Sequence, residues 1–173
     1  MKCVIHGSGG VGGYYGGCLA RAGHEVFFIA RGAHLEAIQQ QGLSIKSAKG
    51  DFRIETPKSG ERCDPNFYPD LVIVAVKSWQ LPKITEEIKN YCTPSTLILP
   101  LQNGADASDI LADTLGPERV LGGLTKIFSK IEAPGVINHF TGATYIGFGE
   151  YFQDHQSVSY THLPSTRDRQ KSR

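Results

Sequence analysis

Near its start the chain reads Cys3-Val4-Ile5-His6 and then Gly7-Ser8-Gly9-Gly10-Val11-Gly12. An apolar strand, a glycine turn and a helical pattern in this order are typical of a turn that holds the pyrophosphate of a dinucleotide. Gly7 allows the tight turn, Gly9 lets backbone N–H groups approach the phosphates, and Gly12 lets the helix lie close to the strand. The N-terminus of that helix would face the anion with unpaired N–H groups.

The alternative interpretation of these glycines is a purely structural turn, since Gly accounts for 20 of the 173 residues. The segment that follows favours the dinucleotide site. Val11, Tyr15 and Cys18 fall on one face of a helix, and Gly23 stands where that helix would end. Glycines at 16–17 inside the helix each cost about 1 kcal/mol relative to Ala, which indicates close packing against a sheet or a ligand.

Apolar runs later in the chain predict an α/β fold with a Rossmann-type, doubly wound and mostly parallel sheet. The first helix leads into a second β-rich run, and such a strand-helix-strand unit forms a parallel, right-handed crossover. Residues 71–76 are unbroken apolar, which is typical of a central strand covered on both faces. The further strands are expected at 25–30, 71–76 and 96–101, and the helices at 33–41, 82–91 and 105–115.

Two hairpins are expected beside this alternation of strands and helices. The first has alternating apolar residues between positions 43 and 54 around a turn at 49–51, directly after the second helix. The second would join 136–140 to 145–148 through the turn Thr141-Gly142. Together with the strand-like run at 120–123, the second hairpin is expected to close the sheet.

These elements predict one Rossmann dinucleotide-binding domain over residues 1–156. The segment 157–173 differs in composition, with six Ser or Thr residues, two aliphatic residues and a basic end. Such a segment is too polar to bury a core of its own. It is expected to be either a disordered basic arm or a non-native sequence. The second alternative is favoured because the residues resemble translated sequencing-adapter read-through. In the second case the natural protein continues beyond residue 156 with other residues.

The composition is that of an ordinary soluble protein of the cytoplasm. The net charge is +1, 40% of the residues are hydrophobic, and there is no basic stripe for nucleic acid and no apolar run that could span a bilayer. We also expect no leader segment, since no charged and then apolar stretch comes before the first strand. The four cysteines lack the spacing of metal ligands and are expected to be reduced thiols. Cys3 and Cys18 are expected in the core, whereas Cys63 lies in a polar loop and is expected to be exposed. We expect no nucleic-acid, membrane or metal partner.

Polar residues follow three of the expected parallel strands. In a doubly wound sheet, ligands bind beyond the carboxyl ends of the strands. This rule predicts that Gly7–Gly12, Lys77-Ser78-Trp79-Gln80 and Gln102-Asn103-Gly104 converge on one crevice. The Lys77 ammonium suits a phosphate, a ribose hydroxyl or a substrate carboxylate, and the Asn103 amide suits a nicotinamide ribose or a substrate hydroxyl. The alternatives are a solvated loop lysine and a turn-forming Asn-Gly pair.

Arg31 ends the second strand, where an NAD-selective site would place an acidic residue on the ribose 2′-hydroxyl. A guanidinium at this position suits a 2′-phosphate, so NADP(H) is favoured over NAD(H). The alternative is a surface arginine that stacks on the adenine of either cofactor.

The remaining candidates for chemistry are few. His6, His24 and His139 lie in or beside strands and are predicted to be structural, with their hydrogen bonds satisfied. Trp79 is predicted to be a packing anchor beneath the crevice. The sequence has no Ser-His-Asp order, no pair of catalytic carboxylates and no zinc-binding helix, so no catalytic residue is assigned.

The glycine turn, Arg31, Lys77-Ser78-Trp79-Gln80 and Gln102-Asn103-Gly104 in this order resemble the amino-terminal half of the ketopantoate reductase (2-dehydropantoate 2-reductase) family. The resemblance covers residues 1–152, and the runs Gly122-Gly123-Leu124-Thr125 and 134–139 add to it. The Lys-x-Trp-Gln and Asn-Gly elements are more specific than the glycine turn. The resemblance implies reduction of the 2-oxo acid 2-dehydropantoate to pantoate by NADPH, a step toward pantothenate and coenzyme A.

The resemblance also implies roles for single residues. The run from Gly7 to Gly12 would hold the pyrophosphate, Arg31 the 2′-phosphate, and Lys77 the cofactor near its reactive end. Asn103 would contact both cofactor and substrate. Ser129 falls near a family position whose backbone touches the nicotinamide, although other members often have Ala there.

Hydride delivery to a ketone creates an alkoxide, so an acid must supply a proton. In the family this acid is a lysine on a carboxyl-terminal helical domain, which also makes most substrate contacts. That domain is expected to be absent from this chain. We therefore expect a chain that binds NADPH with little or no reductase activity, and whose uncovered apolar face favours self-association, for instance as a homodimer.

Two further interpretations of function stay open. The chain could be a stand-alone module that binds NADP(H) and signals through a partner. It could also come from a reductase of another 2-oxo acid, or from a sugar or hydroxyacid dehydrogenase of the same fold that prefers NAD.

Overall fold

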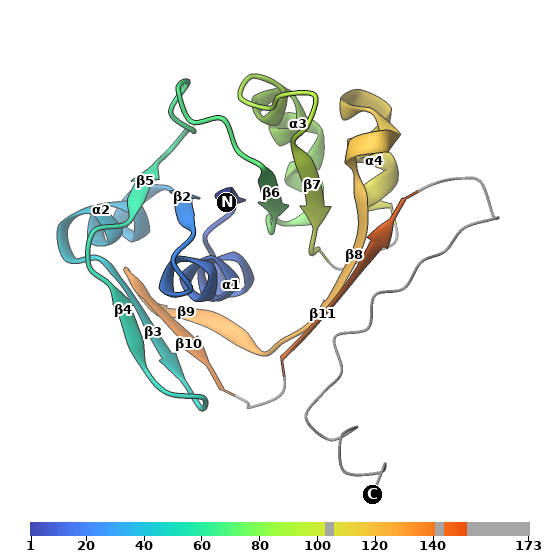
Figure 1. The fold of residues 1–173 in the computed structure, drawn as a ribbon. Coiled ribbons are helices and arrows are strands. Elements are labelled where there is room, and N and C mark those ends of the chain that lie inside the picture. Colours follow the sequence, from blue (N-terminus) through green and yellow to red (C-terminus); the bar gives the residue numbers. More distant parts are fainter. Residues whose placement is uncertain (103–105, 141–143, 152–173) are drawn as a thin grey trace, which may run out of the picture.

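The computed structural model describes residues 1–102, 106–140 and 144–151. Its centre is a sheet of five parallel strands in the order β5-β2-β1-β6-β7, shown in Figure 1. The strands are β1 (Lys2–His6), β2 (Glu25–Ile29), β5 (Lys58–Gly60), β6 (Leu71–Val74) and β7 (Leu97–Pro100). From β1 the chain first adds β2 and β5 on one side and then β6 and β7 on the other, so the order of the strands reverses beside β1. The expected doubly wound parallel sheet is therefore confirmed.

Helices cover both faces of this sheet, and each face has its own core. The helices are α1 (Gly10–Arg21), α2 (Gly32–Gln41), α3 (Leu81–Lys89) and α4 (Ala107–Leu115). Alternation along β1 divides its side chains: Val4 packs in the cluster with α3 and α4, whereas Cys3 and Ile5 pack in the cluster with α1 and α2. Each large aliphatic side chain buried in this way contributes about 1.5–3 kcal/mol.

Helix α1 lies between the parallel sheet and a second sheet (Figure 1). A Cβ at Gly16 would stand 2.6 Å from side-chain atoms of Ile5 and Phe28, and a Cβ at Gly17 would stand 3.0 Å from Ile45. These glycines therefore let α1 approach both sheets, which confirms the close packing expected from the sequence.

The second sheet has four strands in the order β4-β3-β10-β9, and a separate ribbon pairs β11 with β8. These strands are β3 (Leu43–Ser47), β4 (Phe52–Ile54), β8 (Leu121–Lys126), β9 (Ser129–Ala133), β10 (Val136–His139) and β11 (Tyr145–Glu150). The first expected hairpin is confirmed, since Leu43 pairs with Ile54 and Ile45 with Phe52. Figure 1 shows the β8–β11 ribbon running from the β7 edge of the parallel sheet toward the second sheet, and Val120, just before β8, forms a bridge with Ile98 of β7.

The second expected hairpin is wrong. Strand β10 pairs with β3 and β9 instead of β11, and β11 pairs with β8. The physical reason is Ile137, which is fully buried and packs against α1 at Gly13. Burial of that side chain draws β10 into the sheet beneath α1, away from the edge of the parallel sheet. Residues 141–143, with the expected turn, lie outside the described residues.

Several smaller expectations are also corrected. Trp79 is 77% exposed, because it lies on the 3₁₀ turn η1 (Ser78–Gln80) that projects beyond β6. Cys63 is half-buried, its thiol donates to the Phe67 carbonyl oxygen at 3.8 Å, and burial raises its pKa to about 12. Cys3 is buried as expected, and Cys18 is half-buried. None of the helices in the described residues has the length and apolar character needed to cross a lipid bilayer.

Candidate functional site

Three glycines have different structural roles in the turn between β1 and α1. Gly7 has φ +104°, a conformation that L side chains rarely adopt. A Cβ at Gly12 would stand 2.2 Å from the Gly7 carbonyl oxygen, so only glycine allows α1 to start this close to β1. A Cβ at Gly9 would meet nothing within 4 Å. Gly7 and Gly12 shape the backbone, and Gly9 faces open space.

The start of α1 has unsatisfied donors. Its N-cap residue Gly9 makes no side-chain cap, and no acidic residue lies in the first turn. The N–H groups there and the positive end of the helix dipole suit an anion. Ser8 is 2% exposed and its hydroxyl has no partner among the described residues. An unpartnered buried hydroxyl costs about 1–3 kcal/mol, which indicates that a ligand group belongs there.

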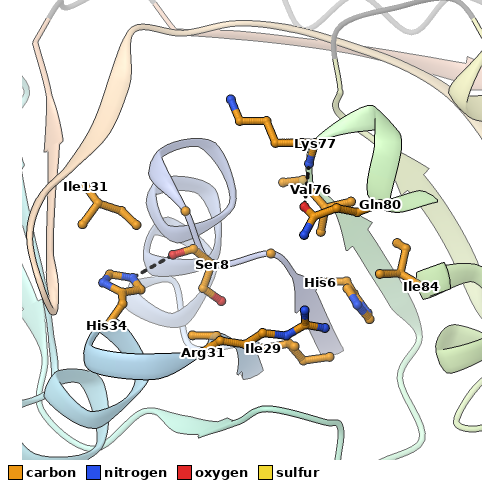
Figure 2. A pocket seen from close by; sticks show the side chains of 14 residues that line it. His6, Ser8, Ile29, Arg31, His34, Val76, Lys77, Gln80, Ile84 and Ile131 are labelled. Carbon is orange, nitrogen blue, oxygen red and sulfur yellow. Dashed lines mark hydrogen bonds between the residues drawn. The ribbon is translucent and has the colours of Figure 1, made fainter. Parts of the chain in front are cut away.

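A first hollow of about 280 Å³ lies on one side of this turn, and Figure 2 shows its lining. The ends of β1, β2 and β6 meet here, with Arg31 after β2 and Lys77 after β6 on opposite sides. Arg31 and Lys77, which are 46 positions apart in the chain, thus both lie beside Gly7–Gly9, as the rule for parallel strand ends predicts.

A second hollow of about 650 Å³ lies on the other side of the turn and shares Gly9 and Lys77 with the first. Gln102 after β7 and Ser129 at the start of β9 line it. The Gln102 amide and the Ser129 hydroxyl are buried without partners among the described residues. The backbone of Ser129 can approach the start of α1 because Gly10 has no side chain: a Cβ there would stand 2.5 Å from the Ser129 carbonyl oxygen.

The structure therefore brings together the glycine turn, Arg31, Lys77 and Ser129. Asn103 and Gly104, the other expected site residues, lie outside the described residues. An extended dinucleotide fits this arrangement, because its pyrophosphate would meet the turn at Gly9, where both hollows open. Within the described residues, no group of three or more His, Cys, Asp or Glu side chains is arranged to hold a metal ion.

Lys77 is placed by the 3₁₀ turn that follows it. Its backbone N–H donates to the Gln80 side-chain oxygen at 3.1 Å, and the Gln80 N–H donates to the Lys77 carbonyl oxygen at 2.9 Å. These two bonds fix the backbone of Lys77 while its ammonium group is exposed, as Figure 2 shows. A fixed backbone with an extended cation suits contact with a ligand that lies across both hollows.

His34 was missed in the sequence, and it ties the glycine turn to the second sheet. Its Nε2 lies 2.9 Å from the Ser8 carbonyl oxygen, and the Gly135 N–H donates to its Nδ1 at 3.0 Å. Since Nδ1 accepts a bond, Nε2 carries the proton and the ring is neutral. Burial lowers the His34 pKa, which agrees with this state. A histidine in the first turn of the helix after Arg31 was the available signal.

Glu87 is the other residue that the sequence did not reveal. Its Oε2 lies 3.9 Å from Arg31 Nη2 and 3.6 Å from His6 Nε2. Burial, together with the smaller effect of the Arg31 charge, lowers the His6 pKa to about 4, so the imidazole is neutral near pH 7. The available signal was its place on α3 beside Ile84 and Ile88, whose buried side chains face the sheet.

The histidines that were expected to be fully hydrogen-bonded are only partly so. His6 Nδ1 is bonded to the Tyr91 hydroxyl at 2.9 Å, and His139 Nδ1 to the Ser47 hydroxyl at 2.8 Å. The Nε2 atom of each ring is buried without a hydrogen-bond partner among the described residues.

Comparison with known proteins gives a consistent result. The family described as ketopantoate reductase PanE/ApbA matches residues 3–151. The "uncharacterized oxidoreductase YkpB" of Bacillus subtilis (strain 168) is 36% identical over 153 residues, which are 87% of this chain and 49% of that protein. The chain thus spans about half the length of the curated relatives it matches.

Solved structures show the same similarity. The crystal structure of 2-dehydropantoate 2-reductase from Geobacter metallireducens GS-15 superposes with a TM-score of 0.82 at 35% identity, over 88% of this chain and 50% of that one. The structure of D-mandelate dehydrogenase with NADH and anilino(oxo)acetate superposes with a TM-score of 0.80 at 26% identity, over 89% of this chain and 50% of that one.

Proposed function

Because the chain belongs to the ketopantoate reductase family PanE/ApbA, a family of nicotinamide-dependent oxidoreductases, we propose that it binds NADP(H) as the cofactor half of an enzyme that reduces 2-dehydropantoate to pantoate. One observation carries this proposal. The open space at Gly9 joins two hollows, with Arg31 beside the first and Lys77 beside both.

Each end of the site has a task in this proposal. The N–H groups at the start of α1 hold the pyrophosphate, and Arg31 receives the 2′-phosphate, since a guanidinium binds phosphate oxygens in a bidentate manner. Lys77 and the backbone of Ser129 hold the reactive end in the second hollow. The family resemblance adds Asn103, which lies outside the described residues, as a contact to both cofactor and substrate. When bound, the reduced dinucleotide supplies the hydride.

Proton supply lies outside this arrangement. The family resemblance assigns the acid to a lysine on a carboxyl-terminal helical domain, and the chain spans about half the length of the relatives it matches. We therefore expect the 173-residue chain to bind the cofactor and to show little or no turnover of 2-dehydropantoate. Turnover at an ordinary enzyme rate by the purified 173-residue chain would contradict this expectation.

A reductase of another 2-oxo acid is the second candidate function. The similarity to D-mandelate dehydrogenase, solved with NADH, favours it. A substrate panel on the product of the uninterrupted reading frame separates the two candidates. We expect the highest kcat/KM for 2-dehydropantoate with NADPH; a higher value for an aromatic 2-oxo acid with NADH would support the second candidate instead.

A further inference from the structure

We propose that Glu87 sets how strongly the site prefers a phosphorylated over a non-phosphorylated dinucleotide, by acting as the counter-charge of Arg31. This inference rests on the proposed function, which assigns Arg31 to the 2′ side of the adenosine ribose. It adds an acidic group that the end of β2 lacks and that α3 supplies from another part of the chain.

The carboxylate is held where it can act. Ile84 and Ile88 are 2% and 0% exposed and fix α3 against the sheet, and Glu87 between them is 26% exposed. Its Oε2 lies 3.9 Å from Nη2 of Arg31, whose side chain is 51% exposed. The glutamate is therefore the anchored partner of this pair, and the arginine is the partner that can turn toward a ligand.

Glu87 also lines a hollow that adjoins the first one. A third hollow of about 420 Å³ is lined by Glu87 and Arg62, and it shares His6 and Ile29 with the first hollow. The carboxylate thus stands at the edge of the space where Arg31 would meet a ribose. Among the described residues, no ion pair within 4 Å joins Arg62 to Glu87.

His6 is close to Glu87 but does not neutralise it. The ring is 2% exposed, its Nδ1 is bonded to the Tyr91 hydroxyl, and its Nε2 is 3.6 Å from the carboxylate without a hydrogen bond. A neutral imidazole offers no counter-charge near pH 7. The charge that faces Glu87 at short range is therefore the Arg31 guanidinium.

This pairing affects two ligands in opposite ways. A 2′-phosphate carries a charge of about −2 and must share Arg31 with the carboxylate, so the two anions repel each other across one guanidinium. A 2′-hydroxyl is a neutral donor, and a carboxylate can accept its hydrogen bond. Glu87 therefore lowers the preference for the phosphorylated dinucleotide that Arg31 creates, and the site can hold either form.

Two adenosine fragments test this inference on the 173-residue chain. The dissociation constants of 2′,5′-ADP and 5′-AMP are measured by NMR titration for the wild type, Glu87→Gln, Glu87→Ala and Arg31→Ala. Glu86→Gln is the matched control, since it removes the same charge from the exposed neighbouring position of α3. Glu87→Ala repeats the loss of charge without an amide, and melting midpoints identify any variant that fails to fold.

We expect Glu87→Gln to tighten 2′,5′-ADP by about three- to tenfold and to leave 5′-AMP unchanged or weaker, with a smaller effect at high salt. A ratio of the two constants that moves no more in Glu87→Gln than in Glu86→Gln would overturn the inference, as would equal weakening of both fragments. A different result identifies failure of the proposed function. If Arg31→Ala leaves the binding of 2′,5′-ADP unchanged, the assignment of Arg31 is wrong, whatever Glu87 does.

Discussion

The two hollows beside the glycine turn differ in how completely the described residues organise them. In the first hollow Arg31 is paired with Glu87 and His34 is bonded to Ser8 and Gly135, whereas the Ser8 hydroxyl and His6 Nε2 have no hydrogen-bond partner among the described residues. In the second hollow the Gln102 amide and the Ser129 hydroxyl lack partners among the described residues. Contacts within the protein therefore place Arg31 and His34 in the first hollow before any ligand arrives, although the Ser8 hydroxyl there still needs a partner. In the second hollow neither the Gln102 amide nor the Ser129 hydroxyl has such a contact.

Large apolar side chains are exposed on the strands near the second hollow. Strands β8 and β9 border the second hollow. Leu124 lies on β8 and is 57% exposed, and Phe128 lies between β8 and β9 and is 58% exposed. Exposed large apolar side chains of this kind are typical of a surface that another group covers. The strand ends of the parallel sheet therefore build the adenosine side of the proposed site. The reactive side depends on more than these strand ends.

Changes in the glycine turn, which both hollows share, have the largest expected effect. A Cβ in Gly12→Ala would stand 2.2 Å from the Gly7 carbonyl oxygen, so α1 has to move and the free energy of unfolding should fall by about 3 kcal/mol or more. Denaturant unfolding measures this loss. Gly9→Ala is the matched control, because its Cβ meets nothing within 4 Å. It should leave stability nearly unchanged while weakening dinucleotide binding. Equal stability of the two variants would break the comparison.

The second largest effect is expected from pH, because a buried histidine lines the first hollow. A His6 pKa lowered from 6.5 to about 4 means that the folded state binds fewer protons than the unfolded state between these values. The stability is full above about pH 6.5 and falls by about 3 kcal/mol as the pH drops to about 4. The described residues that line the second hollow include no histidine and no carboxylate.

Urea unfolding between pH 4 and pH 7 measures this dependence, and His6→Leu provides the comparison. The variant should lose much of the slope while other titrating groups keep theirs. Identical slopes in the wild type and His6→Leu would show that the buried imidazole is not the group responsible.

Substitutions of Arg31 and Lys77 test whether the two hollows bind different ends of one cofactor. Arg31→Ala removes a charge-assisted contact with the 2′-phosphate, which is typically worth about 1.5–3 kcal/mol, so NADPH should bind about 10- to 100-fold more weakly while NADH changes little. Lys77→Ala should weaken both dinucleotides by a similar, smaller factor. Calorimetric titration of each variant with each dinucleotide measures the four ratios. Equal weakening of NADPH and NADH by Arg31→Ala would favour the alternative that Arg31 stacks on adenine.

Much of the first hollow could be predicted from the sequence, because the signals for it are local. An apolar run followed by glycines fixes the turn, and each apolar run marks a strand whose end carries Arg31 or Lys77. The general rule for parallel strand ends then brings these residues together. The contacts of His34 and Glu87 depend on how α2 and α3 are rotated against the sheet, which no local pattern specifies.

The strands near the second hollow were harder to predict, since their partners are chosen by burial over long distances in the chain. The alternation in β10 indicates a strand but does not name β3 and β9 as its neighbours. Burial of Ile137 against α1 decides that pairing. Trp79 was misjudged for a related reason: residue type predicts burial, but the turn after β6 leaves the side chain outside.

The smallest effect is expected for Trp79 itself, on the rim of the second hollow. With 77% of the residue exposed, Trp79→Ala should change the free energy of unfolding by no more than about 0.5 kcal/mol. Thermal unfolding of the variant beside the wild type tests this. A loss of several degrees would mean that the side chain is buried in solution and that the second hollow is more closed than described.

The most direct test of the account is calorimetric titration of the 173-residue chain with NADPH, after circular dichroism has shown that the protein is folded. We expect saturable binding of one NADPH per chain, because the strand ends of the parallel sheet already place the glycine turn and Arg31 around one hollow. A folded chain that releases no heat with NADPH and none with NADH would contradict it.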